Sequence, residues 1–240
     1  MKDWNDIPDA PRSESDARLY AALRSTLSFL HKKTPREDAL NALRSRYPAP
    51  MFIPESDRSM LDAAGLARSD ALLVGALPAL ARHTARERFA EKPRLDHYDC
   101  AAEYLKSFYI GIHVECFYLL CLDKSGQLIA PIMLDRGTDS SAPFQIKQLL
   151  SAAIRCGASG AVLCHNHPKG TREPSREDLV CTLYTLKIIP ATGIILLDHI
   201  IIACDETVGL RGRAIPEPIW RMQNENSRLN RNWLQPSADT

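Results

Sequence analysis

The segment Gly160-Ala161-Val162-Leu163-Cys164-His165-Asn166-His167 runs from apolar residues into two histidines that stand two positions apart. Its apolar part has the length and composition of a buried β-strand. A second segment, Pro174-Ser175-Arg176-Glu177-Asp178-Leu179, follows after a short polar loop and has the residues of a helix start. The sequence thus predicts that metal-binding side chains gather where a strand passes into a helix.

His165 and His167 are expected to point at one spot, because residues two apart in an extended chain face the same side. Cys164 should face the opposite side, which argues against a thiolate ligand. Asp178 falls in the first helical turn, and helical side chains lean toward the N-terminus, here back toward the histidines. Two imidazoles and one carboxylate leave a coordination position open, as in catalytic zinc sites. The same ligands also suit ferrous iron.

Ser175 and Asp178 admit a second interpretation. A serine followed three residues later by an acidic residue is also an N-terminal capping box, in which both side chains bond to the local backbone. The two roles are compatible if a metal lies beside the helix start.

Around this segment, the spacing of apolar residues and turns predicts an α/β (α+β) domain over 98–213, with a mixed β-sheet flanked by helices. The expected strands cover 112–122, 127–134, 160–164, 194–197 and 200–203, and the expected helices cover 99–108, 143–154 and 175–188.

Upstream of this domain, apolar residues recur every three or four positions and no strand pattern precedes residue 97. We expect a poorly ordered lead-in over 1–15 and a small helical bundle over 16–90, with its last helix over 69–89. Residues 90–99 have the composition of a linker. Residues 214–240 are polar and are predicted to form a terminal helix and a loose tail.

Composition excludes some classes of protein. The formal net charge is +1, which gives no sign of a strongly basic nucleic-acid surface. We expect no membrane span and no signal peptide, because no apolar run is long enough and the opening Met1-Lys2-Asp3-Trp4-Asn5-Asp6 is polar. The seven cysteines form no Cys-x-x-Cys pair, so we expect reduced thiols in a cytoplasmic protein.

The pattern His165-x-His167-x7-Ser175-x2-Asp178 resembles the JAMM (MPN-type) zinc metalloproteases. The residues of this pattern are more similar still to those of the bacterial RadC family. The later run Asp198-His199-Ile200-Ile201 also resembles that family. The resemblance covers about 98–212. It implies an MPN/JAMM-like fold with the layering of cytidine deaminases, preceded by a small helical bundle. It also implies a zinc-dependent hydrolase of the metallopeptidase or isopeptidase type, acting on a peptide or protein substrate.

The resemblance also implies roles for individual residues. His165, His167 and Asp178 would be the zinc ligands, and Ser175 would help to stabilise the oxyanion. The family's upstream glutamate maps onto Glu115, which would be the general base. Independently, a carboxylate inside the apolar strand predicted over 112–122 would need a partner such as a zinc-bound water, because an unpaired buried charge is costly.

Two features depart from the family. The run Ala142-Pro143-Phe144-Gln145 stands where a His-Pro-Arg-Glu-like run is usual, and Lys169 stands where serine is more usual. Neither touches a ligand, so they affect the expected handling of substrate rather than metal binding. For Asp198-His199, orientation of a ligand and a purely structural strand-end pair are equal alternatives.

The helical region also resembles the helix-hairpin-helix that precedes the RadC catalytic domain, with Ala64-Gly65-Leu66-Ala67 at the hairpin. Such hairpins bind DNA phosphates through backbone N–H groups at glycines. One glycine remains here, so we interpret it as a degenerate hairpin. The alternative function is therefore a DNA-associated repair or recombination module in which the metal has a secondary role.

Overall fold

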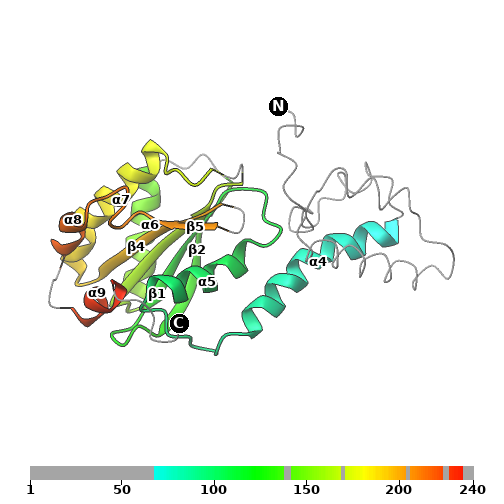
Figure 1. Cartoon of the computed structure of the whole chain (residues 1–240), viewed down its shortest axis with the longest axis horizontal. Coiled ribbons are helices and arrows are strands. Elements are labelled where there is room, and N and C mark those ends of the chain that lie inside the picture. The colour runs from blue at the N-terminus through cyan, green and yellow to red at the C-terminus, as the bar shows by residue number, and fades with distance from the viewer. Residues whose placement is uncertain (1–67, 138–141, 169–170, 204–205, 224–226, 235–240) are drawn as a thin grey trace. The chain divides into compact units, whose positions relative to one another are not determined.

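The computed structural model describes residues 68–137, 142–168, 171–203, 206–223 and 227–234 (Figure 1). The chain divides into two compact units, one of residues 1–84 with 110–113 and the other of residues 85–109 with 114–240. Helix α4 (Arg68–Glu87) confirms the helix expected over 69–89. The lead-in over 1–15, the earlier helices and the hairpin at 64–67 lie outside the described residues, and those expectations stay predictions.

The second unit begins with a helix and then follows the predicted order β-β-α-β-α, but the two last predicted strands are one strand, and a strand over 206–209 that was not predicted follows it. Its elements are α5 (Tyr98–Tyr109), β1 (Cys116–Leu122), β2 (Leu128–Arg136), α6 (Ala142–Arg155), β3 (Gly160–Asn166), α7 (Arg176–Ile188), the 3-10 turn η3 (Ile189–Thr192), β4 (Ile195–Ala203), β5 (Glu206–Gly209), α8 (Glu217–Arg221) and α9 (Arg228–Trp233). None of the helices in the described part of the chain is both long and apolar enough to cross a bilayer.

The five strands form one mixed sheet in the order β2-β1-β3-β4-β5. Only β3 and β4 are parallel, and the other neighbouring pairs are antiparallel. A parallel pair requires a crossover connection, and α7 supplies it. The predicted α+β fold with a mixed sheet is confirmed, and it places the start of α7 just beyond the C-terminal end of β3.

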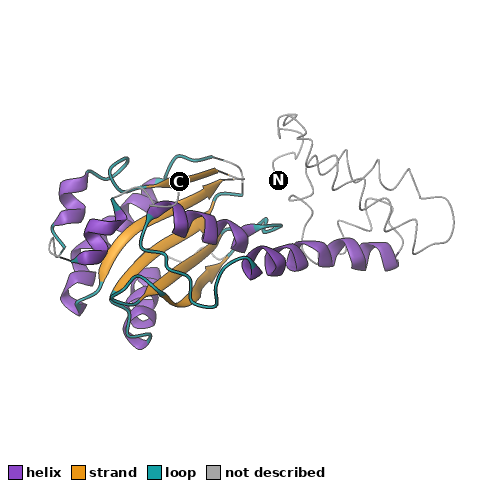
Figure 2. Ribbon diagram, turned by 60° about the horizontal axis from the view of Figure 1, so that its bottom comes forward, coloured by secondary structure: helices purple, strands orange, loops and turns teal. Residues whose placement is uncertain are grey.

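Helices cover both faces of the sheet, as Figure 2 shows. On one face, Tyr118 of β1 lies edge-on against Phe108 and Tyr109 of α5, with ring centroids 5.1 and 5.7 Å apart. On the other face, the next residues along β1, Phe117 and Leu119, join a buried core with side chains of α6, β3 and β4. The alternation of side chains along β1 thus divides the core between the two faces.

Strand β4 differs from the prediction of two strands over 194–197 and 200–203. It is one continuous strand, and every residue in it is buried. Its pairing with β3 passes from Ala161↔Leu196 to Val162↔Asp198, so Leu197 is an extra residue without a partner in the register. Such a bulge reverses which face the following residues point to. The polar pair after Leu197 therefore does not end the strand, as we had expected, but is accommodated within it.

Within 214–240, where a terminal helix and a loose tail were predicted, the structure has two short helices, α8 and α9, whose tryptophans are buried in the second unit. Trp220 is 0 % exposed and Trp233 is 4 % exposed. The Gln223 side chain pairs with the backbone of Leu196, accepting from its N–H at 2.8 Å and donating to its carbonyl at 2.9 Å. The buried tryptophans and the Gln223 pairing hold this polar part of the chain against the second unit, although its composition alone predicted exposure to solvent.

Candidate metal centre

The C-terminal end of β3 holds His165 and His167 on the same side. His165 is the penultimate residue of β3 and is fully buried. Its Nε2 atom lies 2.8 Å from Nε2 of His167. Asn166 points away from them, accepting from the Cys116 N–H at 2.8 Å and donating to the Val114 carbonyl at 3.1 Å. This amide fixes the end of β3 against the entry to β1, so the two imidazoles project from a braced position.

Asp178 approaches the histidines from the first turn of α7, as the lean of helical side chains predicted. Its Oδ1 lies 3.2 Å from Nε2 of His165, and its Oδ2 lies 3.5 Å from Nε2 of His167. One ligand atom from each of the three residues lies within 4.8 Å of the others. A compact set of two imidazoles and a carboxylate is suited to binding a divalent transition metal.

The capping box is present together with this cluster. Ser175 is the N-cap of α7, and its Oγ accepts from the Asp178 N–H at 3.0 Å. The backbone N–H and the hydroxyl of Ser175 both donate to Oδ2 of Asp178, each at 2.7 Å. The capping box is confirmed, and it is compatible with the metal-ligand interpretation of Asp178, because one carboxylate oxygen serves the cap while the other faces His165.

The charges in the cluster stabilise one another. Burial alone would raise the pKa of the Asp178 carboxyl, but hydrogen bonds from His165 and His167 outweigh it, and the pKa lies well below its ordinary value. The hydrogen bond to Asp178 raises the pKa of His167 against the opposing effect of burial, and the charge of Glu115 acts in the same direction. The contacts with the two imidazoles therefore favour the ionised form of the Asp178 carboxyl.

The Nδ1 atoms of both imidazoles are occupied on the side away from Asp178. Nδ1 of His167 lies 2.8 Å from the Thr171 carbonyl, which can only accept, so this nitrogen carries the hydrogen. Nδ1 of His165 lies 2.8 Å from Nε2 of His199. Nε2 of each ring is thus the nitrogen left for a metal. Two such nitrogens 2.8 Å apart repel each other unless a cation lies nearby, and this donor chemistry fits a bound metal ion.

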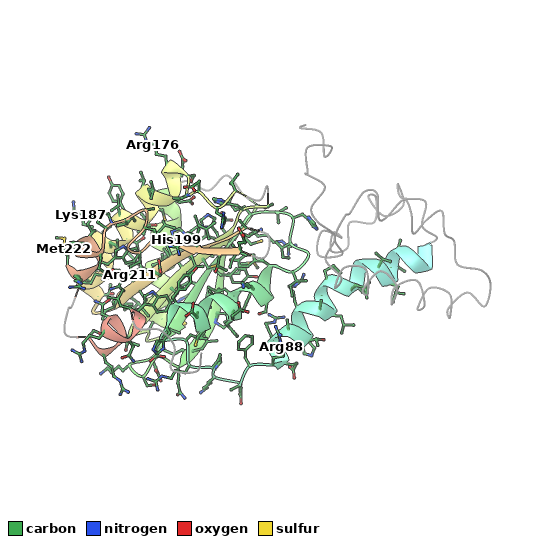
Figure 3. The ribbon with its side chains drawn as sticks, in the orientation of Figure 1. Arg88, Arg176, Lys187, His199, Arg211 and Met222 are labelled. Atoms are coloured by element: carbon green, nitrogen blue, oxygen red, sulfur yellow. The ribbon has the colours of Figure 1, made fainter. Side chains whose placement is uncertain are left out.

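His199 and Asp198 are neighbours in β4 and therefore lie on opposite faces of the sheet. The bulge at Leu197 is what turns His199 toward α7. Figure 3 shows His199 in the interior of the unit, among the strands. Burial lowers the pKa of His199 well below its ordinary value. Asp198 instead accepts from the His199 and Arg211 N–H groups, at 2.7 and 3.0 Å. Of the two alternatives for this pair, contact with a candidate ligand holds for His199 and a structural role holds for Asp198.

Glu115 lies beside the cluster, but in a different setting from the one predicted. It is exposed and precedes β1, which begins at Cys116, so the argument from a carboxylate buried in an apolar strand is wrong. Phe117, two residues on, pairs with His165 in the sheet and stacks on its ring at 5.0 Å. Extending this register by two residues sets Glu115 opposite His167. The carboxylate thus stands at the solvent side of the cluster.

Sequence reasoning missed Thr182, whose hydroxyl contacts both Asp178 and His199. Its position four residues after Asp178, on the same helical face, was the signal that could have identified it. Cys164 lies on the opposite face, as predicted. Its Sγ is 3.3 Å from the Tyr109 hydroxyl, and burial raises the pKa of the thiol.

Comparison with known proteins places residues 95–215 under a family model described as the RadC-like JAB domain. The UPF0758 protein of Finegoldia magna is 29 % identical over 147 residues, which cover 61 % of this chain and 65 % of that protein. UPF0758 protein Bpet3149 of Bordetella petrii is 30 % identical over 65 % of this chain and 69 % of its own length. UPF0758 protein RALTA_A2508 of Cupriavidus taiwanensis is 28 % identical over 80 % and 83 %. The match thus spans slightly less than two thirds of the Finegoldia protein, and none of the three names states an activity.

Proposed function

We propose that this chain, which belongs to the RadC family, is a zinc-dependent hydrolase that cleaves a peptide or isopeptide bond. The observation that carries the proposal is the convergence of His165 Nε2, His167 Nε2 and the Asp178 carboxylate at one spot, with the outer nitrogens of both rings occupied. This donor set with three protein ligands is typical of zinc sites that keep a position open for catalysis.

His165, His167 and Asp178 would hold the zinc ion. Bound zinc supplies Lewis acidity, since it polarises a carbonyl group and lowers the pKa of a coordinated water to about 7. Regular structure positions these residues: β3 holds the first histidine, and the capped start of α7 holds the carboxylate. Such preorganisation limits the cost of assembling the site.

Glu115 would act as the general base and acid. It would take a proton from the attacking water and deliver it to the leaving amine. Its position before β1, exposed and in register with His167, allows the carboxylate to meet both the cluster and an incoming substrate. An exposed carboxylate is also free to rotate between these two tasks.

Ser175 would donate a hydrogen bond to the oxyanion that forms when the carbonyl is attacked. In the structure its hydroxyl donates to Asp178 instead. The role therefore requires a rotation of one side-chain torsion, which would leave the backbone N–H of Ser175 to hold the carboxylate alone.

The proposed substrate is a peptide or protein, and the proposed location is the cytoplasm. None of the cysteines that the structure describes is in a disulfide bond, which suits a reducing compartment. DNA binding depended on the hairpin at 64–67, which lies outside the described residues.

The test is metal analysis of the purified full chain. We expect about one zinc per chain, and anaerobic purification would reveal ferrous iron if that were the native metal. Asp178→Asn should lose the metal while remaining folded. Glu115→Gln is the matched control, because it removes a carboxylate beside the cluster and should keep the metal. A wild-type chain that is folded but does not bind zinc would refute the proposal.

A further inference from the structure

The hydroxyl group of Thr182 lies one turn beyond Asp178 on α7 and is fully buried. It donates to the Asp178 carbonyl at 2.6 Å, and it also lies 2.6 Å from Nδ1 of His199. A threonine hydroxyl has a single hydrogen, and a carbonyl can only accept. Because that hydrogen is committed to the carbonyl, the contact with His199 requires Nδ1 of the imidazole to carry the other hydrogen.

His199 passes this constraint on to His165. In its neutral form the fully buried imidazole of His199 has one N–H and one acceptor nitrogen. With its hydrogen on Nδ1, His199 accepts at Nε2, which lies 2.8 Å from Nδ1 of His165. Nδ1 of His165 must therefore donate. Its Nε2, which faces Asp178, is then the nitrogen without a hydrogen in the neutral ring.

We propose that Thr182 and His199 are positioning residues that fix His165 in the one tautomer able to bind a metal. This inference rests on the metal-binding role proposed above. The opposite polarity would place hydrogens on Nε2 of His199 and on Nε2 of His165. The second of these would occupy the atom that must coordinate. The carbonyl of Asp178 excludes that arrangement, because it takes the only hydrogen of the Thr182 hydroxyl. Asp178 thus orients His165 through Thr182 and His199.

The bulge at Leu197 is what brings His199 into this chain of hydrogen bonds. Leu196 lies in the core between the sheet and α6 and α7. In an unbroken strand His199, three residues later, would point to the opposite face. The extra residue reverses that parity and turns the imidazole toward Thr182 and His165.

The first test measures the tautomer of His199 directly, in the full chain labelled with 15N and freed of metal by a chelator. Long-range 1H–15N correlation spectra distinguish an imidazole with hydrogen on Nδ1 from one with hydrogen on Nε2. We expect Nδ1–H for His199, whether His165 carries one hydrogen or two. A spectrum that shows Nε2–H for His199 would overturn the inference. No variant and no bound zinc are needed.

The second test measures zinc affinity by competition with a chromophoric chelator. Thr182→Val keeps the shape of the side chain but removes the hydroxyl, and we expect affinity to fall about 10- to 100-fold. Thr182→Ser restores the hydroxyl and should stay within about 3-fold of wild type. Thr185→Val is the matched control, because Thr185 is equally buried and donates to the Cys181 carbonyl at 2.8 Å on the same helix.

Thr185→Val should also remain within about 3-fold of wild type, since Thr185 has no imidazole partner among its hydrogen bonds in the structure. Equal losses in the two valine variants, or none in Thr182→Val, would overturn the positioning role. If wild type binds no zinc, the proposed function fails, and the tautomer measurement alone still decides whether the hydrogen bonds have this polarity.

Discussion

Replacing Ser175 with alanine should lower the free energy of unfolding of the second unit by about 2–3 kcal/mol. The variant loses the bond that Oγ accepts from the Asp178 N–H, and loss of an N-cap costs about 1 kcal/mol. It also loses the bond that the hydroxyl donates to Oδ2 of Asp178, and hydrogen bonds to charged groups contribute about 1.5–3 kcal/mol. The total stays near the lower end because the backbone N–H of residue 175 still donates to the same oxygen.

Urea unfolding followed by tryptophan fluorescence would measure this loss. Two of the three tryptophans in the chain, Trp220 and Trp233, are buried in the second unit and report its unfolding. The experiment needs a chelator, because bound metal would add its own stabilisation. Ser175→Thr is the control, since threonine is also an effective N-cap and retains the hydroxyl.

A loss below about 0.5 kcal/mol in Ser175→Ala would refute the reasoning, because that is the range of ordinary surface substitutions. An equal loss in Ser175→Thr would refute it as well, since the hydroxyl would then not be the cause.

Three further measurements test other parts of the structure. Burial raises the pKa of Asp198 to about 6, so the folded state holds a proton that the unfolded state releases near pH 4. Wild type should therefore lose about 2.4 kcal/mol relative to Asp198→Asn as pH rises from 4 to 7, and a difference independent of pH would contradict this. Gly209→Ala would place a Cβ 2.5 Å from Oδ2 of Asp198 and should cost about 1–3 kcal/mol. Gly160→Ala should cost less, because its one short contact, at 2.8 Å, is with the flexible end of Leu229; urea unfolding would measure both losses. Zinc at about 100 times its Kd should stabilise wild type by about 2.7 kcal/mol and should leave Asp178→Asn unchanged.

The local parts of the candidate site could be predicted from the sequence. His165 and His167 are two residues apart in a strand, and Asp178 is in the first turn of the next helix, so local periodicity fixes where each side chain points. The same periodicity predicted the order of strands and helices in the second unit from α5 to α7, but it divided β4 into two strands and missed β5. These features depend on interactions between residues close in sequence, and such interactions can be read without knowing the fold.

Features that depend on distant residues could not be predicted. The start of β1 is set by its pairing with β2, in which Cys116 is the first paired residue. Without knowledge of that pairing the residues before Cys116 were included in the strand, which led to the wrong setting for Glu115. The pair Asp198-His199 looked like a strand end because both residues are polar. Its burial within the strand depends on hydrogen bonds with Thr182 and with the Arg211 N–H, which the sequence does not reveal. Trp220 and Trp233 lie in polar segments, and only the packed sheet explains their burial.

Along a strand, odd-numbered and even-numbered residues point to opposite faces of the sheet. The extra residue Leu197 acts on β4 as a frameshift acts on a coding sequence: everything after it is read in the other frame. A deletion of one residue between Leu196 and His199 would therefore leave composition almost unchanged while exchanging the two sides of the rest of the strand. When this strand is shortened or grafted, the number of residues on each side of the bulge must be kept, because it decides which side chains face α7.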